Sequence, residues 1–206
     1  MGTDADSEQT AVGATDTERS VIGIVGLPGS GKSEAARVAR NHGIPVVTMG
    51  DVIRQACRDR GLDPTTDHGA VAKALRDEHG PGAIAEASLP HIEAALEENS
   101  TVVVDGIRSD VEVDRFEEAF GGAFTLVSIE APFETRAARL DIRGRDADER
   151  DGGESLSDRD ERELAFGMGR AIERADRSLE NTSSLDAFRE QVSEILHTER
   201  SEEEGL

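Results

Sequence analysis

The sequence predicts an α/β fold in which a five-stranded parallel sheet lies between two layers of helices. Short apolar runs rich in β-branched residues alternate along the chain with longer stretches of helical character. Parallel strands need crossover connections, and such an alternation supplies them. With 206 residues, the chain has the length of one ordinary domain. We therefore expect a single domain over residues 20–200.

Five segments have the composition of strands. The run at 21–25 is apolar and ends at Gly26, which is typical of a central strand buried on both faces. The predicted strands are, in chain order, 21–25, 44–48, 101–104, 123–130 and a short one at 178–180. The predicted helices are 32–41, 51–60, 83–98, 133–143, 158–174 and 185–197.

Three segments do not follow this alternation. Residues 1–19 are rich in Thr, Asp, Ser, Ala and Gly, and we expect a disordered acidic tail there. Residues 62–82 combine Pro, Gly and charge, and residues 144–157 are almost entirely Asp, Glu, Arg and Gly. Both are predicted to be mobile flaps rather than part of the core.

The composition excludes several classes of partner. The chain has 23 Lys and Arg against 44 Asp and Glu, a formal charge of -21, which repels nucleic acids and anionic membranes. No apolar stretch has the length of a membrane span, and the polar start has no signal-peptide core. Cys57 is the single cysteine, so no disulfide forms within the chain. We expect a cytoplasmic protein without nucleic-acid or membrane partners.

Lysine is scarce, because only Lys32 and Lys73 occur and every other cation is arginine. This composition resembles that of haloarchaeal cytosolic proteins. Their many carboxylates repel one another at low ionic strength and are screened within about 3 Å at molar salt. The alternative is a protein that is acidic without being halophilic.

A complete P-loop pattern lies between the first predicted strand and the first predicted helix. Its residues are Gly26-Leu27-Pro28-Gly29-Ser30-Gly31-Lys32-Ser33. The glycines allow backbone N–H groups to curl around phosphate oxygens, and the following helix adds the positive end of its dipole. Lys32 would reach the β- and γ-phosphates, and Ser33 would bind magnesium. The pattern predicts ATP and Mg²⁺ as cofactors.

Asp105 is the second candidate on the metal side. It follows the apolar run 102–104, which places its carboxylate at the carboxyl end of a parallel strand, where ligands gather in open α/β sheets. An aspartate that caps a turn or a helix would give the same pattern.

Two segments resemble the nucleoside monophosphate kinases. Gly50-Asp51-Val52-Ile53-Arg54 looks like their Gly-Asp-x-x-Arg, and Asp105-Gly106-Ile107-Arg108 looks like their Asp-Gly-x-Pro-Arg without the proline. In that family the two arginines hold the phosphate of the acceptor, which implies this role for Arg54 and Arg108. A guanidinium grips phosphate in bidentate fashion. The alternative is that both arginines form surface ion pairs.

The end of the chain resembles the dephospho-CoA kinases, with Ala175-Asp176, Asn181 and Ser184-Leu185 before a closing helix. There the loop around the Asn lies by the adenine of ATP, which implies that Asn181 helps to bind the cofactor. Residues 21–196 as a whole resemble an archaeal family of P-loop proteins predicted to be nucleotide kinases, related to dephospho-CoA kinase and adenylate kinase. This implies a P-loop NTPase fold like that of nucleoside monophosphate kinases, with an acceptor-side flap at about 51–82 and a lid at about 144–160.

Asp51 distinguishes two kinds of acceptor. In dephospho-CoA kinases an aspartate after the second strand takes the proton of the acceptor hydroxyl, whereas a monophosphate acceptor is already an anion and needs no base. Asp51 is therefore a catalytic candidate. It could equally be the N-cap of the helix that follows.

Arginines near the predicted lid complete the candidate site. Arg139 and Arg143 are four apart and share one helix face, and Arg159 and Arg162, three apart, share another across the charged flap. The resemblance to a kinase lid implies that such arginines close over the phosphates and stabilise the transition state. We favour Arg139 and Arg143 as catalytic; the alternative is a solvated, ion-paired helix face.

These observations predict an ATP-dependent phosphotransferase with a small anionic acceptor. The acceptor is either dephospho-CoA or another hydroxyl compound, or a nucleoside monophosphate. The alternative from another class is a switch or assembly factor that binds and slowly hydrolyses ATP and acts on a protein partner.

Overall fold

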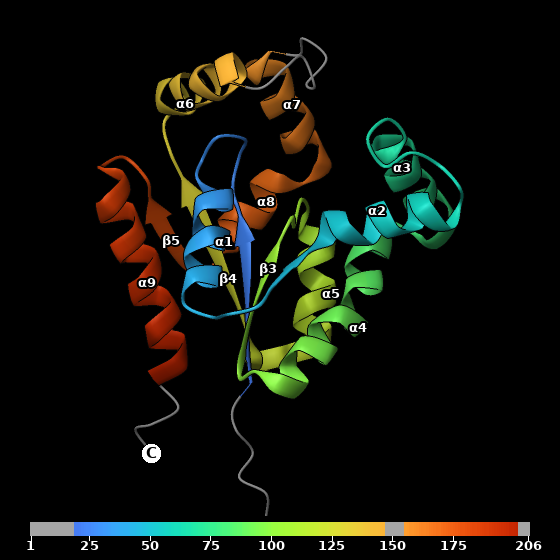
Figure 1. The fold of residues 1–206 in the computed structure, drawn as a ribbon, viewed down its shortest axis with the longest axis horizontal. Helices are drawn as coiled ribbons and strands as arrows, with labels where there is room; N and C mark the ends of the chain where they lie inside the picture. Colours follow the sequence, from blue (N-terminus) through green and yellow to red (C-terminus); the bar gives the residue numbers. More distant parts are fainter. Residues whose placement is uncertain (1–18, 147–154, 202–206) are drawn as a thin grey trace, which may run out of the picture.

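The computed structural model contains one parallel sheet, whose strands have the order β2-β3-β1-β4-β5 (Figure 1). The strands are β1 (Ser20–Val25), β2 (Val46–Thr48), β3 (Thr101–Asp105), β4 (Phe124–Glu130) and β5 (Arg177–Glu180). The structure describes residues 19–146 and 155–201, and within them not the side chains of 141–146 and 199–201. The predicted five-stranded parallel sheet is confirmed, while the predicted tail and most of the charged flap at 144–157 lie outside the described residues.

The central strand explains why its sequence is apolar throughout. All six residues of β1 are buried, because β3 and β4 pair with it on either side and helices cover both faces. Gly23 in this strand leaves room for a neighbour, since a Cβ there would lie 2.7 Å from the ring of Phe124. The strand that leads into the P-loop is therefore fixed on every side.

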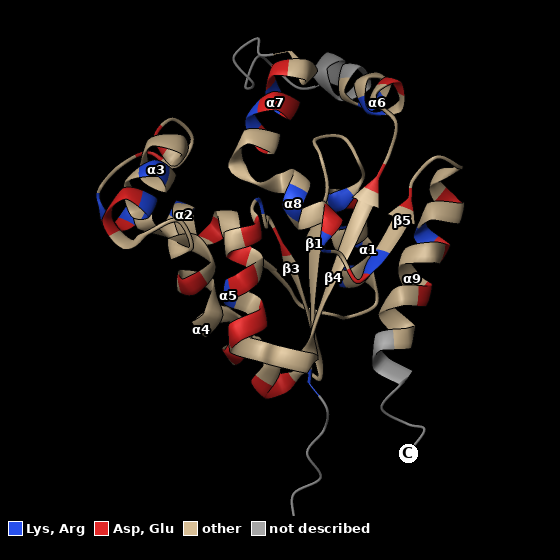
Figure 2. Ribbon diagram, turned by 180° about the vertical axis from the view of Figure 1, so that it is seen from behind, with Lys and Arg blue, Asp and Glu red and all other residues tan. Residues whose placement is uncertain are grey.

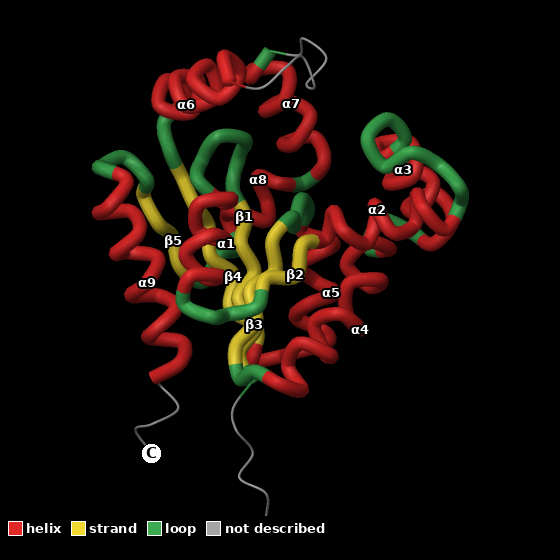
Figure 3. Tube along the Cα trace, viewed as in Figure 1, coloured by secondary structure: helices red, strands yellow, loops and turns green. Residues whose placement is uncertain are grey.

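Helices cover the sheet in two layers (Figure 3). On one face lie α1 (Lys32–Asn41) and α9 (Leu185–Ser201), which share an apolar cluster with the sheet that includes Ile22, Val103 and Phe188. The other face carries a larger cluster. Its helices are α4 (Ala83–Glu98), α5 (Asp110–Phe120) and α8 (Met168–Glu173). The three-layer arrangement follows from apolar residues on both faces of one sheet.

Two helical arms extend beyond the carboxyl ends of the strands (Figure 1). One arm contains α2 (Met49–Asp59) and α3 (His68–His79), and the other contains α6 (Phe133–Asp146) and α7 (Leu156–Phe166). A short 3₁₀ turn, η1 (Gly121–Ala123), precedes β4. The arms stand on either side of the sheet edge where ligands of α/β proteins gather.

The structure corrects three details of the predicted elements. The segment 62–82 is not an irregular flap, because α3 forms within it and buries Val71 and Ala72 against the core. The helix α5 was not among the predicted elements. The single helix expected at 158–174 is two helices, because Gly167 has φ +111° and a Cβ there would lie 2.5 Å from a carboxylate oxygen of Asp110.

The acidic residues lie mainly on outward-facing helical surfaces, as Figure 2 shows along α5. Many pair with arginines in exposed ion pairs, such as Arg115 with Glu118 and Arg174 with Asp114. Such pairs add little stability each, and acids outnumber basic residues by 44 to 23. Within the described residues, no helix combines the length and apolar character that a membrane crossing requires.

We predict that potassium chloride stabilises the fold. The repulsion between surface carboxylates is screened within about 3 Å at 1 M salt, so the melting temperature should rise steadily between 0.2 and 3 M KCl. Circular dichroism at 222 nm suits the measurement, because the chain contains neither Trp nor Tyr. A melting temperature that stays constant or falls over this range would contradict the charge-repulsion argument.

Candidate active site

The P-loop connects β1 to α1 in a conformation that depends on its glycines. Gly26, Gly29 and Gly31 have φ values of +148°, +79° and +124°, which side chains disfavour. The loop is also tightly enclosed from behind. A Cβ at Gly26 would lie 2.4 Å from the Ile129 carbonyl oxygen, and one at Gly31 would lie 2.4 Å from the Asn181 amide nitrogen. The glycines are thus needed for both the turn and its packing.

The loop ends at a helix N-terminus that suits an anion. Helix α1 begins at Lys32 with Gly31 as its N-cap, and no side chain caps it. Uncapped first-turn amides and the helix dipole attract negative charge. The hydroxyl of Ser30 is buried and has no hydrogen-bond partner within the described part of the chain. Residues 28–33 line a cavity of about 500 Å³.

Lys32 points its ammonium back over the loop, where it donates to the carbonyl oxygens of Gly26 and Leu27, the latter at 3.2 Å. Burial lowers the pKa of Lys32 to about 8, and the carboxylates of Asp105 and Glu163 partly oppose this shift. A nearby anion would strongly stabilise the charged form of such a desolvated ammonium. Lys32 is therefore well placed to neutralise phosphate charge.

Asn181 and Arg139 support the loop from behind. The Asn181 side chain donates to the Ser30 carbonyl at 2.8 Å and accepts from Arg139 at 3.0 Å. Arg139 also donates to the Ser30 carbonyl at 3.3 Å. Neither residue lines the cavity. The structure thus places these two predicted site residues against the P-loop backbone rather than in the cavity.

Arg136 is a further support that the sequence did not reveal. Its guanidinium donates to both carboxylate oxygens of Asp160, at 2.8 and 2.7 Å, and to the carbonyl oxygens of Pro28 and Ala131. The side chain is only 5% exposed and that of Asp160 only 13%. One buried cation thus joins α6, α7 and the P-loop.

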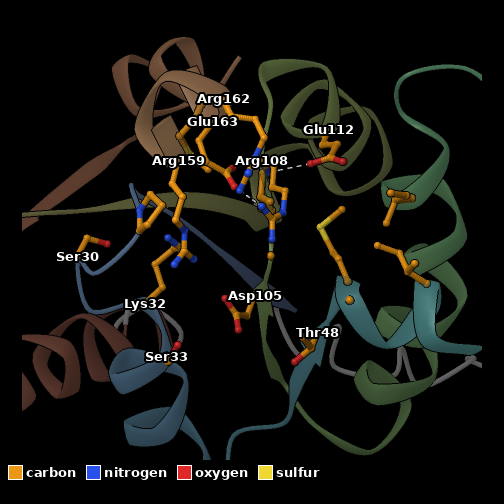
Figure 4. A pocket seen from close by; sticks show the side chains of 18 of the residues that line it. Ser30, Lys32, Ser33, Thr48, Asp105, Arg108, Glu112, Arg159, Arg162 and Glu163 are labelled. Atoms are coloured by element: carbon orange, nitrogen blue, oxygen red, sulfur yellow. Dashed lines mark hydrogen bonds and ion pairs between the residues drawn. The ribbon is translucent and has the colours of Figure 1, made fainter. Parts of the chain in front are cut away.

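Asp105 lies at the end of β3, beside Thr48 at the end of β2 in the register of the sheet. Both line the cavity together with Ser33 (Figure 4). The described residues contain no group of three or more His, Cys, Asp or Glu that could hold a metal by itself. A magnesium ion that bridges phosphates needs only one or two protein oxygens, so Ser33 and Asp105 fit that kind of site.

The cavity concentrates positive charge in an acidic protein. It is lined by six cationic side chains and three carboxylates of the described chain. The cations are Lys32, Arg54, Arg76, Arg108, Arg159 and Arg162, and the acids are Asp105, Glu112 and Glu163. The whole chain carries a formal charge of -21. A local excess of cations against this background indicates anionic ligands.

Asp51 lies in the first turn of α2 and points mainly toward solvent. The N-cap of α2 is Thr48, so the expected N-cap role of Asp51 is wrong. Its side chain is 67% exposed, accepts two hydrogen bonds from Arg54 at 2.9 and 2.6 Å, and does not line the cavity. Arg54 does line it.

Arg108 is surrounded by two carboxylates. Its backbone N–H donates to Glu112 at 2.7 Å, and its guanidinium pairs with Glu163 of α7. Glu112 is fully buried, and burial raises its pKa although the Arg108 amide and Arg76 counteract the shift. The Glu163 side chain is 8% exposed, whereas that of Arg108 is 51% exposed. Arg108 thus contacts the arm of α6 and α7 directly.

Helix α7 presents two arginines to the cavity. Arg159 and Arg162 both line it, and in Figure 4 Arg159 extends from the helix toward Lys32. Arg143 belongs to α6, and its side chain lies outside the described residues. Of the four arginines considered for the lid, Arg159 and Arg162 are therefore the described ones that line the cavity. The sequence analysis had favoured Arg139 and Arg143.

Several cavity residues were missed by sequence reasoning. His68 and Arg76 belong to α3, inside the segment expected to be irregular, and Glu112 belongs to the unpredicted α5. Helical spacing of Val71, Ala72 and Leu75 was the available signal for α3. Glu163 has no comparable signal, because it lies in a run of charged residues.

Comparisons with known proteins agree with this geometry. A family model described as an AAA domain matches residues 22–164. A UPF0200 protein of Halobacterium salinarum is 61% identical over 184 residues, which cover 87% of this chain and 96% of that protein.

Solved structures show the same fold at low identity. TT1252 from Thermus thermophilus has a TM-score of 0.58 at 22% identity, with 88% of this chain and 98% of that chain covered. Shikimate kinase from Acinetobacter baumannii, in complex with shikimate, has a TM-score of 0.54 at 17% identity, with 88% and 93% covered. These likenesses establish a P-loop kinase-like fold.

We predict that Arg136→Met destabilises the protein by about 3–5 kcal/mol, because it leaves the Asp160 carboxylate buried without its partner. Urea unfolding followed by circular dichroism in constant KCl measures the change. The control is Arg115→Met, which removes an exposed pair with Glu118 and should cost at most about 1 kcal/mol. Equal losses in the two variants would contradict a structural role for the buried pair.

Proposed function

The chain belongs to the UPF0200 family, and we propose that it is an ATP- and magnesium-dependent phosphotransferase that acts on a small anionic acceptor. One observation carries the proposal: a single cavity has a P-loop at one end and arginines from three different elements at the other. Such a cavity could bind the phosphates of ATP at one end and an anionic acceptor at the other, with the two ligands in contact between the arms.

The nucleotide half of the cavity would hold ATP through the P-loop. The backbone amides of residues 26–33 would bind its phosphates, and Lys32 would neutralise the β- and γ-phosphates. Ser33 and Asp105 would hold magnesium, which offsets negative charge on the transferred group when it is bound. The resemblance to dephospho-CoA kinases implies that adenine would lie near the loop of Asn181, whose side chain donates a hydrogen bond to the P-loop backbone.

The second arm would complete the site when the phosphates are in place. Arg159 and Arg162 reach the cavity from α7 and would stabilise charge on the transferred group. Arg139 would act by positioning Ser30 and Asn181, and Arg143 remains a proposed lid residue. The helix would also limit the access of water, which competes with the acceptor.

The residues in the acceptor half of the cavity favour an acceptor whose attacking oxygen is already ionised. Arg54 and Arg108 line this end and would bind its negative charge. The exposure of Asp51 and its pairing with Arg54 argue against a role as the base for a hydroxyl acceptor. An anionic oxygen needs no such base.

We predict that ATP turnover in multimolar KCl requires both an acceptor and Lys32. A panel of phosphorylated metabolites, nucleoside monophosphates and dephospho-CoA should contain an acceptor, and Lys32→Ala should lower its turnover by about 10²-fold or more. Lys73→Ala is the matched control, because Lys73 is the other lysine and forms an exposed pair with Asp77. Slow hydrolysis that no acceptor accelerates would favour the nucleotide-switch alternative.

The affinity for ATP should depend on pH through Lys32. Its pKa is about 8 in the free protein, and bound phosphate favours the protonated form, so binding above pH 8 must take up a proton. We predict constant affinity from pH 7 to 8 and then a fall of up to about tenfold per pH unit. Calorimetry at saturating Mg²⁺ measures this. Lys32→Arg keeps its charge, and the same decline in that variant would rule out Lys32 as the cause.

A further inference from the structure

The acceptor end of the cavity contains more basic groups than the two arginines that the motifs indicate. His68 and Arg76 of α3 line it together with Arg54 of α2 and Arg108 after β3. The four side chains come from the consecutive helices α2 and α3 and from the loop after β3. Their convergence on one end of one cavity is a property of the folded chain.

Arg76 is held in a defined orientation. Its guanidinium lies 4.6 Å from the ring centre of Phe166, donates to Glu112 at 3.4 Å and donates to the Ala72 carbonyl at 3.5 Å. Its Nε is buried and has no hydrogen-bond partner in residues 19–146 and 155–201. Stacking on an aromatic ring restrains the guanidinium plane, so Arg76 needs little reorganisation to bind an anion.

His68 reports how closely the cations approach one another. Burial lowers the pKa of His68, a hydrogen bond with the Gly50 backbone opposes this, and the charges of Arg54, Arg108 and Arg76 lower the pKa further. The imidazole therefore lies within the field of all three guanidinium groups. A ligand that neutralises this field would raise the pKa of His68 again.

Three carboxylates pair with these cations, and each does so from a different position. Glu112 is already used by the Arg108 backbone amide and by Arg76, and Asp51 pairs with Arg54 from outside the cavity. Glu163 pairs with the Arg108 guanidinium from α7. Glu163 is thus the carboxylate that occupies the side of Arg108 where a ligand anion would bind.

We propose that Arg54, His68, Arg76 and Arg108 form one binding subsite for a phosphomonoester dianion, and that this phosphate takes the place of Glu163 on Arg108. The proposal rests on the phosphotransferase function and specifies its substrate class. Three guanidinium groups offer paired N–H donors to three terminal oxygens, whereas a carboxylate has two oxygens and one charge. The rest of the acceptor would contact the apolar wall of Ile53, Ile84 and Met168.

The reaction at such a subsite balances without a base. An acceptor phosphate oxygen attacks the γ-phosphorus of ATP, and the bond from that phosphorus to the β-phosphate oxygen breaks. The products are ADP and the diphosphate ester of the acceptor. No proton has to leave the acceptor, because its attacking oxygen is ionised at neutral pH. The exposed position of Asp51 is consistent with this course.

The experiment follows the His68 imidazole by NMR, with the resonance assigned by His68→Gln, in protein saturated with ADP and Mg²⁺ at constant KCl. Saturation with ADP directs the added anion to the acceptor end. We expect methyl phosphate to shift the resonance toward the protonated form and to bind at least about tenfold more tightly than methyl sulfate, which has one negative charge.

Two variants separate binding from folding. Arg76→Gln should weaken methyl phosphate binding by about tenfold or more, whereas Glu163→Gln should strengthen it several-fold because the competing charge is removed. Arg76→Gln should leave the affinity for ADP unchanged. A loss of folding cannot produce the gain expected for Glu163→Gln. Arg115→Gln is the surface control and should change neither affinity.

The proposal is overturned if methyl phosphate binds no more tightly than methyl sulfate. It is also overturned if Arg76→Gln keeps full affinity for methyl phosphate, or if Glu163→Gln weakens it. Failure of the proposed function would give a different result: ADP would not bind, or it would bind equally well to the Lys32→Ala variant. The two results are distinguishable because ADP binding is measured by calorimetry and phosphate binding at His68.

Discussion

The turn between β1 and α1 is the constraint on which the rest of the site depends. Three glycines with positive φ allow the chain to leave a strand buried on both faces and to enter a helix within a few residues. That path leaves the first amides of α1 without a side-chain cap. The loop cannot shift backward, because Asn181 and the Ile129 carbonyl occupy the space behind it. A rigid cradle for anions results from backbone geometry and its packing.

Acidic and basic side chains are distributed differently over the protein, and several of the basic ones gather around the P-loop cavity. Acids dominate the outer surface, where water and salt solvate them, while six of the few cations line one cavity. The desolvation of Lys32 lowers its pKa to about 8 and has an energetic cost that a phosphate would repay through direct contact. Similarly, the guanidinium groups of Arg54, Arg108 and Arg76 lower the pKa of His68, and a bound anion would oppose this effect. The same electrostatic principle therefore applies at both ends of the cavity.

The sequence predicted what is encoded locally. The strands and the P-loop were recognisable because apolar runs and the Gly-Lys-Ser pattern occur within a few consecutive residues. The roles of Arg136 and Arg139 were not recognisable, since their partners Asp160 and Asn181 lie 24 and 42 residues away. An arginine that is buried under a loop and one on a solvated helix face have the same local pattern. Tertiary contacts decide between them. Asp51 shows that a helix start is also ambiguous in the sequence, because the N-cap position of its helix is Thr48.

Helix α7 is held in place by two ion pairs of different burial. Arg136 and Asp160 are both nearly buried and tie the beginning of α7 to the P-loop, whereas Arg108 is half exposed where it pairs with Glu163. Separation of the first pair would leave charges in a low-dielectric environment, but the second can exchange its carboxylate for another anion at smaller cost. Asp160 and Glu163, the acidic members of the two pairs, both lie on α7, three residues apart. An anion that replaced Glu163 on Arg108 would remove one contact of the helix that also carries Arg159 and Arg162, so we expect occupation of the proposed acceptor end to influence these two arginines.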